Sequence, residues 1–345
     1  MIYDDDVNVS DFAAFYSAYG SAAAWADQTS EYGVGLLTAG KLVSLGQMPA
    51  SVSETTLLGK IPRPPASNTI YSFAIPSAVK FDDGASTNAC CSSYDGYHYV
   101  TTVGGIQVPY SITCECPAEA QQFGITLFED IAIELSHLAV DTTTDPFFKG
   151  WEQTDDAHAA WTYATIDGEL AELCEFANTA NWLDAVPGGY AAQRTWSNQA
   201  AAAGHDPCVG DPTTPYYQTI PTDPDSASVS FGIPDAAGNS SWAAKGTQIA
   251  LGATGTITMT VYSDDPASGP YNVEVVDYNQ WLSEATPYLQ LGTITGTFMP
   301  GDMVSVSAQV KARDPALSGG EAYVVETSPV SGVGPTTYYF ALVVQ

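Results

Sequence analysis

The chain has 345 residues, of which 9 are lysine or arginine and 39 are aspartate or glutamate, so its formal net charge is -30. This length is enough for two domains, each with its own core. A surface this acidic repels nucleic acid and anionic lipid, which excludes both as partners, and the even spread of the acidity favours a halophilic or marine source.

The first 55 residues are expected to form an N-terminal helical segment. Apolar side chains at helical spacing behind a Ser10/Asp11 cap predict an amphipathic helix over residues 11–26. Residues 6–15 resemble the second half of a calcium-binding loop running into its helix, with Asp4, Asp6, Asn8 and Asp11 as the candidate ligands. The upstream ligand positions are missing, so a capped packing helix is the alternative. The chain start shows no basic or apolar leader, and no secretory signal is predicted in this numbering.

The next elements belong to an expected α+β domain over residues 56–210. Residues 69–79 and 97–114 are rich in Val, Ile, Tyr and Thr, which predicts strands. Residues 118–141 predict a long helix, with an apolar stripe at Phe123, Leu127, Ile131, Leu135 and Leu138. A second helix is expected over residues 166–178.

Six cysteines stand in two neighbourhoods of the sequence. Their even number favours disulfides, with the Cys90/Cys91 pair joined to the Cys114/Cys116 pair, and Cys174 joined to Cys208. Zinc held by the first four is the alternative, although adjacent cysteines do not match the usual knuckle spacing.

A composition change marks the next boundary. Residues 204–224 are dense in Pro, Asp and Thr, which predicts a linker, placed at 211–226. Short alternating strands then recur over residues 227–345, for example at 256–262, 304–310 and 338–344. This spacing predicts an antiparallel β-sandwich of immunoglobulin-like or jelly-roll type.

Residues from about 57 to 209 carry an ordered set of short blocks. The set comprises Lys60-Ile61-Pro62, Asn68-Thr69-Ile70-Tyr71, Tyr97-His98, Val108-Pro109-Tyr110, Ser136-His137, Thr144-Asp145-Pro146, Gly150-Trp151, Glu169-Leu170-Ala171-Glu172-Leu173-Cys174, Gln193-Arg194 and Trp196-Ser197-Asn198. Together they resemble a zincin-like family that includes the plant phosphate-induced (Exordium) proteins and secreted bacterial and fungal relatives. The resemblance implies a metalloprotease-like scaffold.

The helix block departs from the family pattern where catalysis would need it. Relatives read Ser-His-Glu-x-x-Glu, whereas here Leu138 follows His137 and Asp141 takes the last position. Leucine cannot act as a general base toward a metal-bound water. A degenerate zinc site remains conceivable, in which Glu169 or Glu172 joins His137 and Asp141, because positions i and i+4 of a helix share a face.

Structural roles compete with these functional ones. His137 alternatively is a hydrogen-bonded core histidine, and Trp151, Trp182 and Trp196 are expected as core anchors rather than sugar platforms. Asp155, Asp156 and His158 form a second acidic and imidazole cluster, expected to be solvated at a helix start.

The sequence therefore favours an extracellular, non-catalytic protein with a metalloprotease-like scaffold that serves in structure, adhesion or assembly. A surface protein on the virion of a halophile's virus, such as a spike, turret or fibre, is one version. The expected partners are other protein subunits or a cell-surface protein or glycan, with no membrane span. A secreted zinc metallopeptidase with an atypical base and a carbohydrate-binding surface protein are the alternatives.

Overall fold

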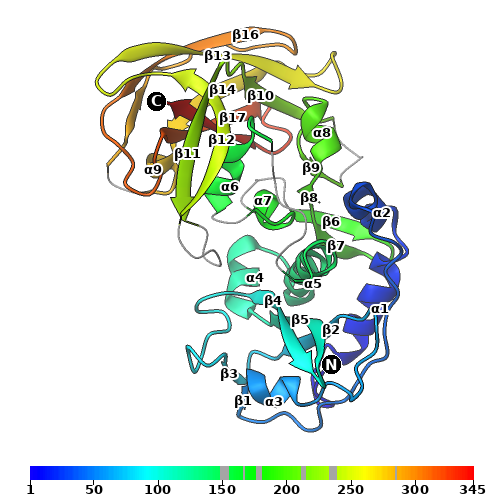
Figure 1. The fold of residues 1–345 in the computed structure, drawn as a ribbon. Coiled ribbons are helices and arrows are strands. Elements are labelled where there is room, and N and C mark those ends of the chain that lie inside the picture. The colour runs from blue at the N-terminus through cyan, green and yellow to red at the C-terminus, as the bar shows by residue number, and fades with distance from the viewer. Residues whose placement is uncertain (148–154, 166–167, 176–180, 211–214, 233–238, 284–285) are drawn as a thin grey trace. The chain divides into compact units, whose positions relative to one another are not determined.

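The computed structural model describes residues 1–345 except 148–154, 166–167, 176–180, 211–214, 233–238 and 284–285. The chain is α+β and forms two compact units (Figure 1). Unit 1 comprises residues 1–151 and 181–194, and unit 2 comprises residues 152–180 and 195–345. Each unit is described by itself below.

Unit 1 combines short strands with helices. Its elements are α1 (Val9–Tyr19), α2 (Ala23–Thr29), the 3-10 turn η1 (Ser30–Tyr32), β1 (Ser51–Ser53), α3 (Glu54–Leu58), β2 (Tyr71–Ile75), β3 (Lys80–Asp82), β4 (Gly96–Val103), β5 (Ile106–Cys114), α4 (Pro117–Phe123), α5 (Leu127–Thr144), β6 (Asn181–Val186) and β7 (Tyr190–Gln193). Strands β2, β5 and β4 form a three-stranded sheet, in which β2 and β5 are parallel and β4 and β5 antiparallel. Parallel β1 and β3, and antiparallel β6 and β7, make two smaller sheets.

The single helix predicted over residues 11–26 is two helices in the structure. The chain breaks between α1 and α2, where Gly20 lies against the backbone of the following loop. A Cβ atom at Gly20 would stand 2.2 Å from the Leu37 carbonyl oxygen, so only glycine allows this close approach.

The predicted helix over residues 118–141 is also divided. Gly124 ends α4 with a φ of 71°, and Thr126 then begins α5 with a capping box to Glu129. Residues Ile131, Leu135 and Leu138 of the predicted stripe are buried, whereas Phe123 at the end of α4 is 57% exposed. The buried stripe therefore belongs to α5 alone. The prediction of one continuous helix was wrong because Gly124 ends α4.

Unit 2 is rich in strands. Its elements are α6 (Ala159–Thr165), α7 (Glu172–Glu175), β8 (Thr195–Trp196), α8 (Asn198–Ala202), β9 (Cys208–Val209), β10 (Tyr217–Pro221), β11 (Asp225–Gly232), β12 (Asn239–Gln248), β13 (Thr254–Ser263), β14 (Tyr271–Asp277), α9 (Tyr278–Trp281), β15 (Leu289–Leu291), β16 (Met303–Val310), β17 (Gly320–Pro329) and β18 (Thr337–Val344). Two larger sheets have the strand orders β10-β13-β16-β15 and β11-β12-β18-β17-β14.

The burial of alternate residues explains how these two sheets form a core. Along β13 and β16 every second side chain is buried, while most of β18 is buried throughout. Strand β10 of the first sheet contacts β17 and β18 of the second, and the Thr337 hydroxyl donates to the Tyr217 carbonyl oxygen at 2.8 Å.

The units divide the chain differently from the expected boundaries. Residues 152–180 and 195–210, expected with the N-terminal domain, lie in unit 2, where α6 packs against β18. The expected linker contains β10, whose Gln218 and Thr219 are polar but buried. The helix expected over 166–178 falls partly outside the described residues, and its described part contains the single turn α7.

All six cysteines form disulfides, as the sequence predicts. The bonds are Cys90–Cys114 and Cys91–Cys116 in unit 1, and Cys174–Cys208 in unit 2. The four cysteines of unit 1 therefore offer no thiolate to zinc, which removes the metal alternative for them.

Candidate functional site

Helix α5 holds His137 and Asp141 side by side, one turn apart. The imidazole Nε2 of His137 lies 3.2 Å from Asp141 Oδ2, and its Nδ1 lies 2.9 Å from Gln193 Oε1 on β7. Both side chains are buried, so this pair is part of the interior of unit 1. An imidazole between two acceptors either donates from both nitrogens or presents one nitrogen to a cation.

A chain of buried hydrogen bonds fixes Gln193 and thereby His137. The Gln193 N–H donates to the Ser136 hydroxyl at 2.7 Å, and the Gln193 carbonyl accepts from the Gln28 amide at 2.6 Å. Gln28 in turn accepts from the Tyr19 hydroxyl at 2.6 Å. Burial raises the pKa of Tyr19, and the nearby charge of Asp141 raises it further. The network ties α1, α2, α5 and β7 together, which is a structural role for His137.

The positions that would supply a general base face another way. Leu138 is buried, and a Cβ atom built on Gly96 of β4 would lie 3.0 Å from its Cδ1 and 2.2 Å from Glu134 Oε1. Leu138 and Glu134 therefore share the face of α5 that packs on β4, whereas His137 bonds to Gln193 of β7. Glu134 therefore lies on a different face of α5 from His137.

Unit 1 supplies half of the predicted zinc ligands. A catalytic zinc takes three protein ligands and keeps one position open. Glu169 and Glu172 belong to unit 2. Asp145 is buried at the end of α5, where its N–H donates to the Asp141 carbonyl at 2.7 Å.

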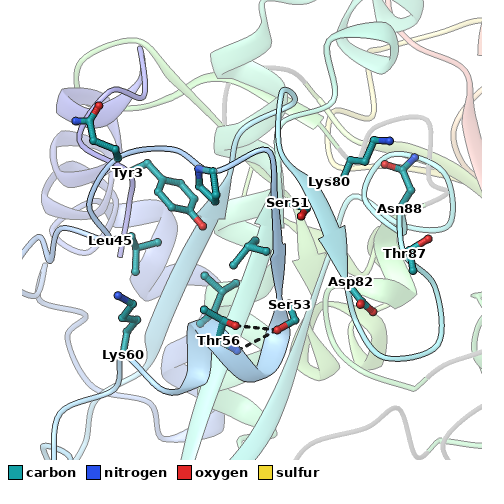
Figure 2. Close-up of a pocket in the computed structure, with 14 residues that line it drawn as sticks. Tyr3, Leu45, Ser51, Ser53, Thr56, Lys60, Lys80, Asp82, Thr87 and Asn88 are labelled. Carbon is teal, nitrogen blue, oxygen red and sulfur yellow. Dashed lines mark hydrogen bonds between the residues drawn. The ribbon is translucent and has the colours of Figure 1, made fainter.

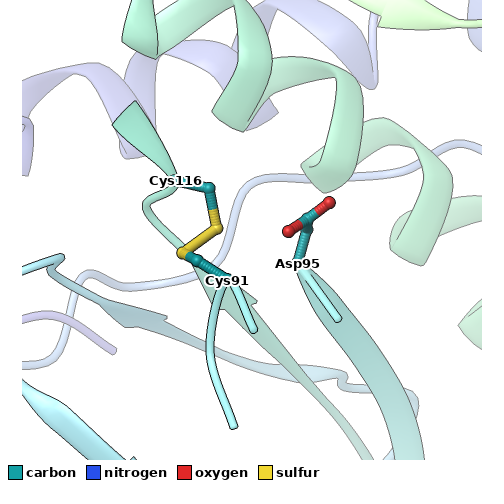
Figure 3. A group of neighbouring side chains, drawn as sticks. All are labelled: Cys91, Asp95 and Cys116. Atoms are coloured by element: carbon teal, nitrogen blue, oxygen red, sulfur yellow. A yellow bond between two sulfur atoms is a disulfide. The ribbon is translucent and has the colours of Figure 1, made fainter. Parts of the chain in front are cut away.

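A second group of potential ligands lies at the Cys91–Cys116 disulfide of unit 1. Figure 3 shows Asp95 beside the bonded Cys91 and Cys116, so its carboxylate has no thiolate partner for metal binding. Asp95 instead faces Glu119 of α4. Burial, a hydrogen bond to Asp95 and the charges of neighbouring carboxylates raise the pKa of Glu119 to about 8. Glu119 is therefore largely protonated at neutral pH.

The residues of the half calcium loop do not gather. Asp6 Oδ1 accepts the Asn8 N–H at 2.8 Å, and the Asn8 amide donates to Glu115 Oε1 at 2.9 Å. Asp4 is exposed, and Asp4, Asp6 and Asp11 do not form a ligand group in the part of the chain that the structure describes. The real partner of Asp6 is Glu115, which is 109 positions away and 3% exposed. Burial raises the pKa of Glu115 to about 7, and the charge of Asp6 adds to this.

We expect the Asp6–Glu115 pair to make unit 1 less stable as the pH rises from about 5 to about 7. The folded state holds the Glu115 proton more tightly than the unfolded chain does, so the stabilisation is present in acid and is lost as the pH passes the folded pKa. Glu115→Gln cannot ionise, and its free energy of unfolding should exceed that of the wild type at pH 8 and match it near pH 4. Urea unfolding at five pH values measures this difference, and parallel pH profiles for the two proteins would contradict it.

The acidic and imidazole cluster of unit 2 has a structural role. His158 Nδ1 lies 2.7 Å from Asp155 Oδ2, and Asp155 also accepts the backbone N–H of Ala157 and His158. The sequence predicted a solvated cluster, but His158 is buried, and its ring lies against Trp196 and Tyr339. Asp156 pairs with Lys245 at 3.4 Å. The cluster therefore caps the start of α6 and anchors it.

Trp196 is fully buried, in agreement with its expected core role. Trp151 lies outside the described residues, as do Gly150 and the side chain of Trp182. The sequence missed Gln28, the buried partner of Gln193, because no local pattern links two glutamines 165 positions apart. Gln193 itself belongs to the Gln193-Arg194 block, one of those that resemble the zincin-like family.

No known protein family matches this chain, and no curated protein is similar to it. Among solved structures, domains 4 and 5 of the S-layer protein SbsC align with 39% of this chain and 72% of their own, at 10% sequence identity and a TM-score of 0.19. A score this low carries no argument about fold or function. In the described residues, no helix has the length and apolar character needed to cross a bilayer.

Proposed function

We propose that this chain is an extracellular, non-catalytic component of a surface structure, serving in adhesion or assembly. In this proposal unit 1 is a zincin-like scaffold that has lost its chemistry, and unit 2 is an antiparallel β-sandwich. The observation that carries it is the orientation of α5. Buried Leu138 occupies the base position, Glu134 faces β4, and His137 is bonded into the core through Gln193.

Two further features support an extracellular scaffold. Three disulfides among the described residues fit an oxidising compartment. In unit 2, the contacts of β10 with β17 and β18 support two sheets packed face to face, as a β-sandwich requires. A net charge of -30 keeps such a protein soluble outside the cell.

A secreted zinc metallopeptidase is the second candidate, and one observation favours it. His137 and Asp141 lie on one face of α5 with Nε2 and Oδ2 only 3.2 Å apart, which suits two ligands of one metal ion. A metal bound there would polarise a carbonyl group or activate a water, and His137 and Asp141 would be the residues of α5 that hold it.

Metal content and peptidase activity distinguish the two candidates. We expect elemental mass spectrometry on protein purified without chelator to find no stoichiometric zinc, and unstructured peptides to remain uncleaved with or without added zinc. His137→Gln should lower the midpoint of thermal unfolding because it breaks the buried network at Gln193. Stoichiometric zinc that His137→Gln removes, together with peptide cleavage that a chelator stops, would establish the peptidase instead.

A further inference from the structure

Unit 1 contains a groove of about 650 Å³ that includes no residue of α5 and is therefore separate from His137. Its walls come from the N-terminal segment, strands β1 and β3, helix α3 and the loop that follows β3. Figure 2 shows the lining side chains, with Lys60 and Lys80 on opposite sides of the group.

The floor of the groove is apolar. Tyr3, Leu45, Val52 and Leu57 belong to the buried hydrophobic core of unit 1 and also line the groove. A floor of this kind accepts the non-polar face of a ligand, such as the C–H face of a sugar ring, while polar groups at the rim set its orientation.

The Tyr3 hydroxyl is directed at a ligand position. Tyr3 is 3% exposed, and its hydroxyl has no hydrogen-bond partner among the described residues. Figure 2 shows this hydroxyl pointing among the other lining side chains. Burial raises the pKa of Tyr3, which keeps the hydroxyl a proton donor. The hydroxyl is not among the fully enclosed atoms that lack a partner, so it can donate to an oxygen atom of a bound molecule in place of water.

Two cations stand at the rim in a chain that is otherwise strongly acidic. Lys60 and Lys80 are exposed and form no ion pair with a described residue. Asp82 is the acidic side chain on this rim, and its Oδ1 accepts the Gly84 N–H at 2.9 Å. Two free ammonium groups favour an anionic ligand, because charge-assisted hydrogen bonds are stronger than neutral ones.

The remaining rim groups suit hydroxyl groups of the ligand. Gln47, Ser51, Thr87 and Asn88 present amide and hydroxyl side chains that bond to no other described residue. Such groups both donate and accept, which is what a polyhydroxylated ligand needs. We infer that this groove binds a short acidic oligosaccharide, with its carboxylate or sulfate groups at Lys60 and Lys80 and one sugar hydroxyl on Tyr3.

Other anionic ligands fit the groove less well. A nucleic acid would require many phosphate contacts and would meet the net charge of -30 around the groove. It would also need an exposed aromatic ring for its bases, whereas Tyr3 offers little more than its hydroxyl. A short acidic saccharide carries far fewer charges, and two of them can pair with Lys60 and Lys80.

Isothermal titration of the full chain with tetragalacturonate in about 50 mM salt tests this inference, since salt screens the contacts. We expect saturable binding at one site, and a loss of about a hundredfold in affinity for the Lys60→Gln/Lys80→Gln variant, because each of the two lost charged hydrogen bonds accounts for about tenfold. Tyr3→Phe should lose about threefold while keeping its thermal stability, because the hydroxyl has no partner in the free protein.

The matched control is Lys41→Gln/Lys311→Gln. It makes the same change in net charge at two exposed lysines outside the groove and should bind tetragalacturonate as the wild type does. Equal binding of a neutral tetrasaccharide, equal loss in the control variant, or no binding of tetragalacturonate would each overturn the inference. Inorganic sulfate that binds as tightly as tetragalacturonate would show an anion site without sugar recognition. None of these outcomes depends on whether α5 holds zinc.

Discussion

Removing both disulfides of unit 1 is expected to cost about 1 kcal/mol more than the sum of removing each alone. Cys90–Cys114 and Cys91–Cys116 close loops of 24 and 25 positions that nearly coincide along the chain. Once one bond has closed this loop in the unfolded chain, the second constrains only a few further residues. The loop-entropy relation then gives about 2 kcal/mol for either single removal and about 5 kcal/mol for both.

Urea unfolding of Cys90→Ala/Cys114→Ala, Cys91→Ala/Cys116→Ala and the fourfold variant measures the three values. Hydrogen exchange of peptides from β4 and β5 assigns the loss to unit 1. Cys174→Ala/Cys208→Ala is the control, because its loop of 34 positions lies in unit 2 and stands alone. It should cost about 4 kcal/mol and leave the exchange of β4 and β5 unchanged. Costs that simply add in unit 1 would mean that the two bonds stabilise by local packing rather than by a shared loop.

Local patterns in the sequence predicted several elements of the fold. The buried stripe of α5 and the strands β13 and β16 follow from periodicity, because each of these elements has one face that must leave water. Strand β18 follows instead from a short apolar run, which is buried on both faces. Periodicity failed at β10, where polar Gln218 and Thr219 are buried: the Gln218 amide donates to the Tyr338 carbonyl oxygen, and the Thr219 hydroxyl accepts from Thr327. Periodicity also does not show which sheet a helix packs against. Helix α6 was therefore expected in the α+β domain over residues 56–210, whereas it belongs to unit 2.

The side-chain pairings of the candidate sites were harder still to predict from the sequence than the strands and helices. The position of Leu138 beside His137 is visible in the sequence, and so is its consequence for a general base. The bond of His137 to Gln193, the pairing of Asp6 with Glu115 and the groove around Tyr3 join residues separated by 56, 109 and more than 80 positions. Such pairings depend on tertiary packing, and a single sequence contains no local signal for them.

Replacing Trp161 by alanine is expected to remove about 3–5 kcal/mol from the stability of unit 2, the range for deleting a large buried aromatic side chain. Trp161 is fully buried, and its ring meets Trp196, Tyr339 and Phe340 at centroid distances of 5.3, 5.6 and 5.1 Å in edge-to-face geometry. These contacts attach α6 to β18, so the alanine variant should expose α6 first. Hydrogen exchange of α6 peptides, together with calorimetry, measures both effects.

Trp161→Phe separates the ring contacts from the indole N–H. The Nε1 atom of Trp161 is buried without a hydrogen-bond partner among the described residues, so phenylalanine removes an unsatisfied donor as well as ring volume. We expect a loss of only about 1–2 kcal/mol, because the relief of that donor offsets part of the cavity. Trp281→Ala, at a partly exposed ring that also contacts Phe340, is the control and should cost less than Trp161→Ala. If Trp161→Ala unfolds within about 1 kcal/mol of the wild type, α6 is not part of the core of unit 2, since a buried ring of this size cannot be deleted from a core so cheaply.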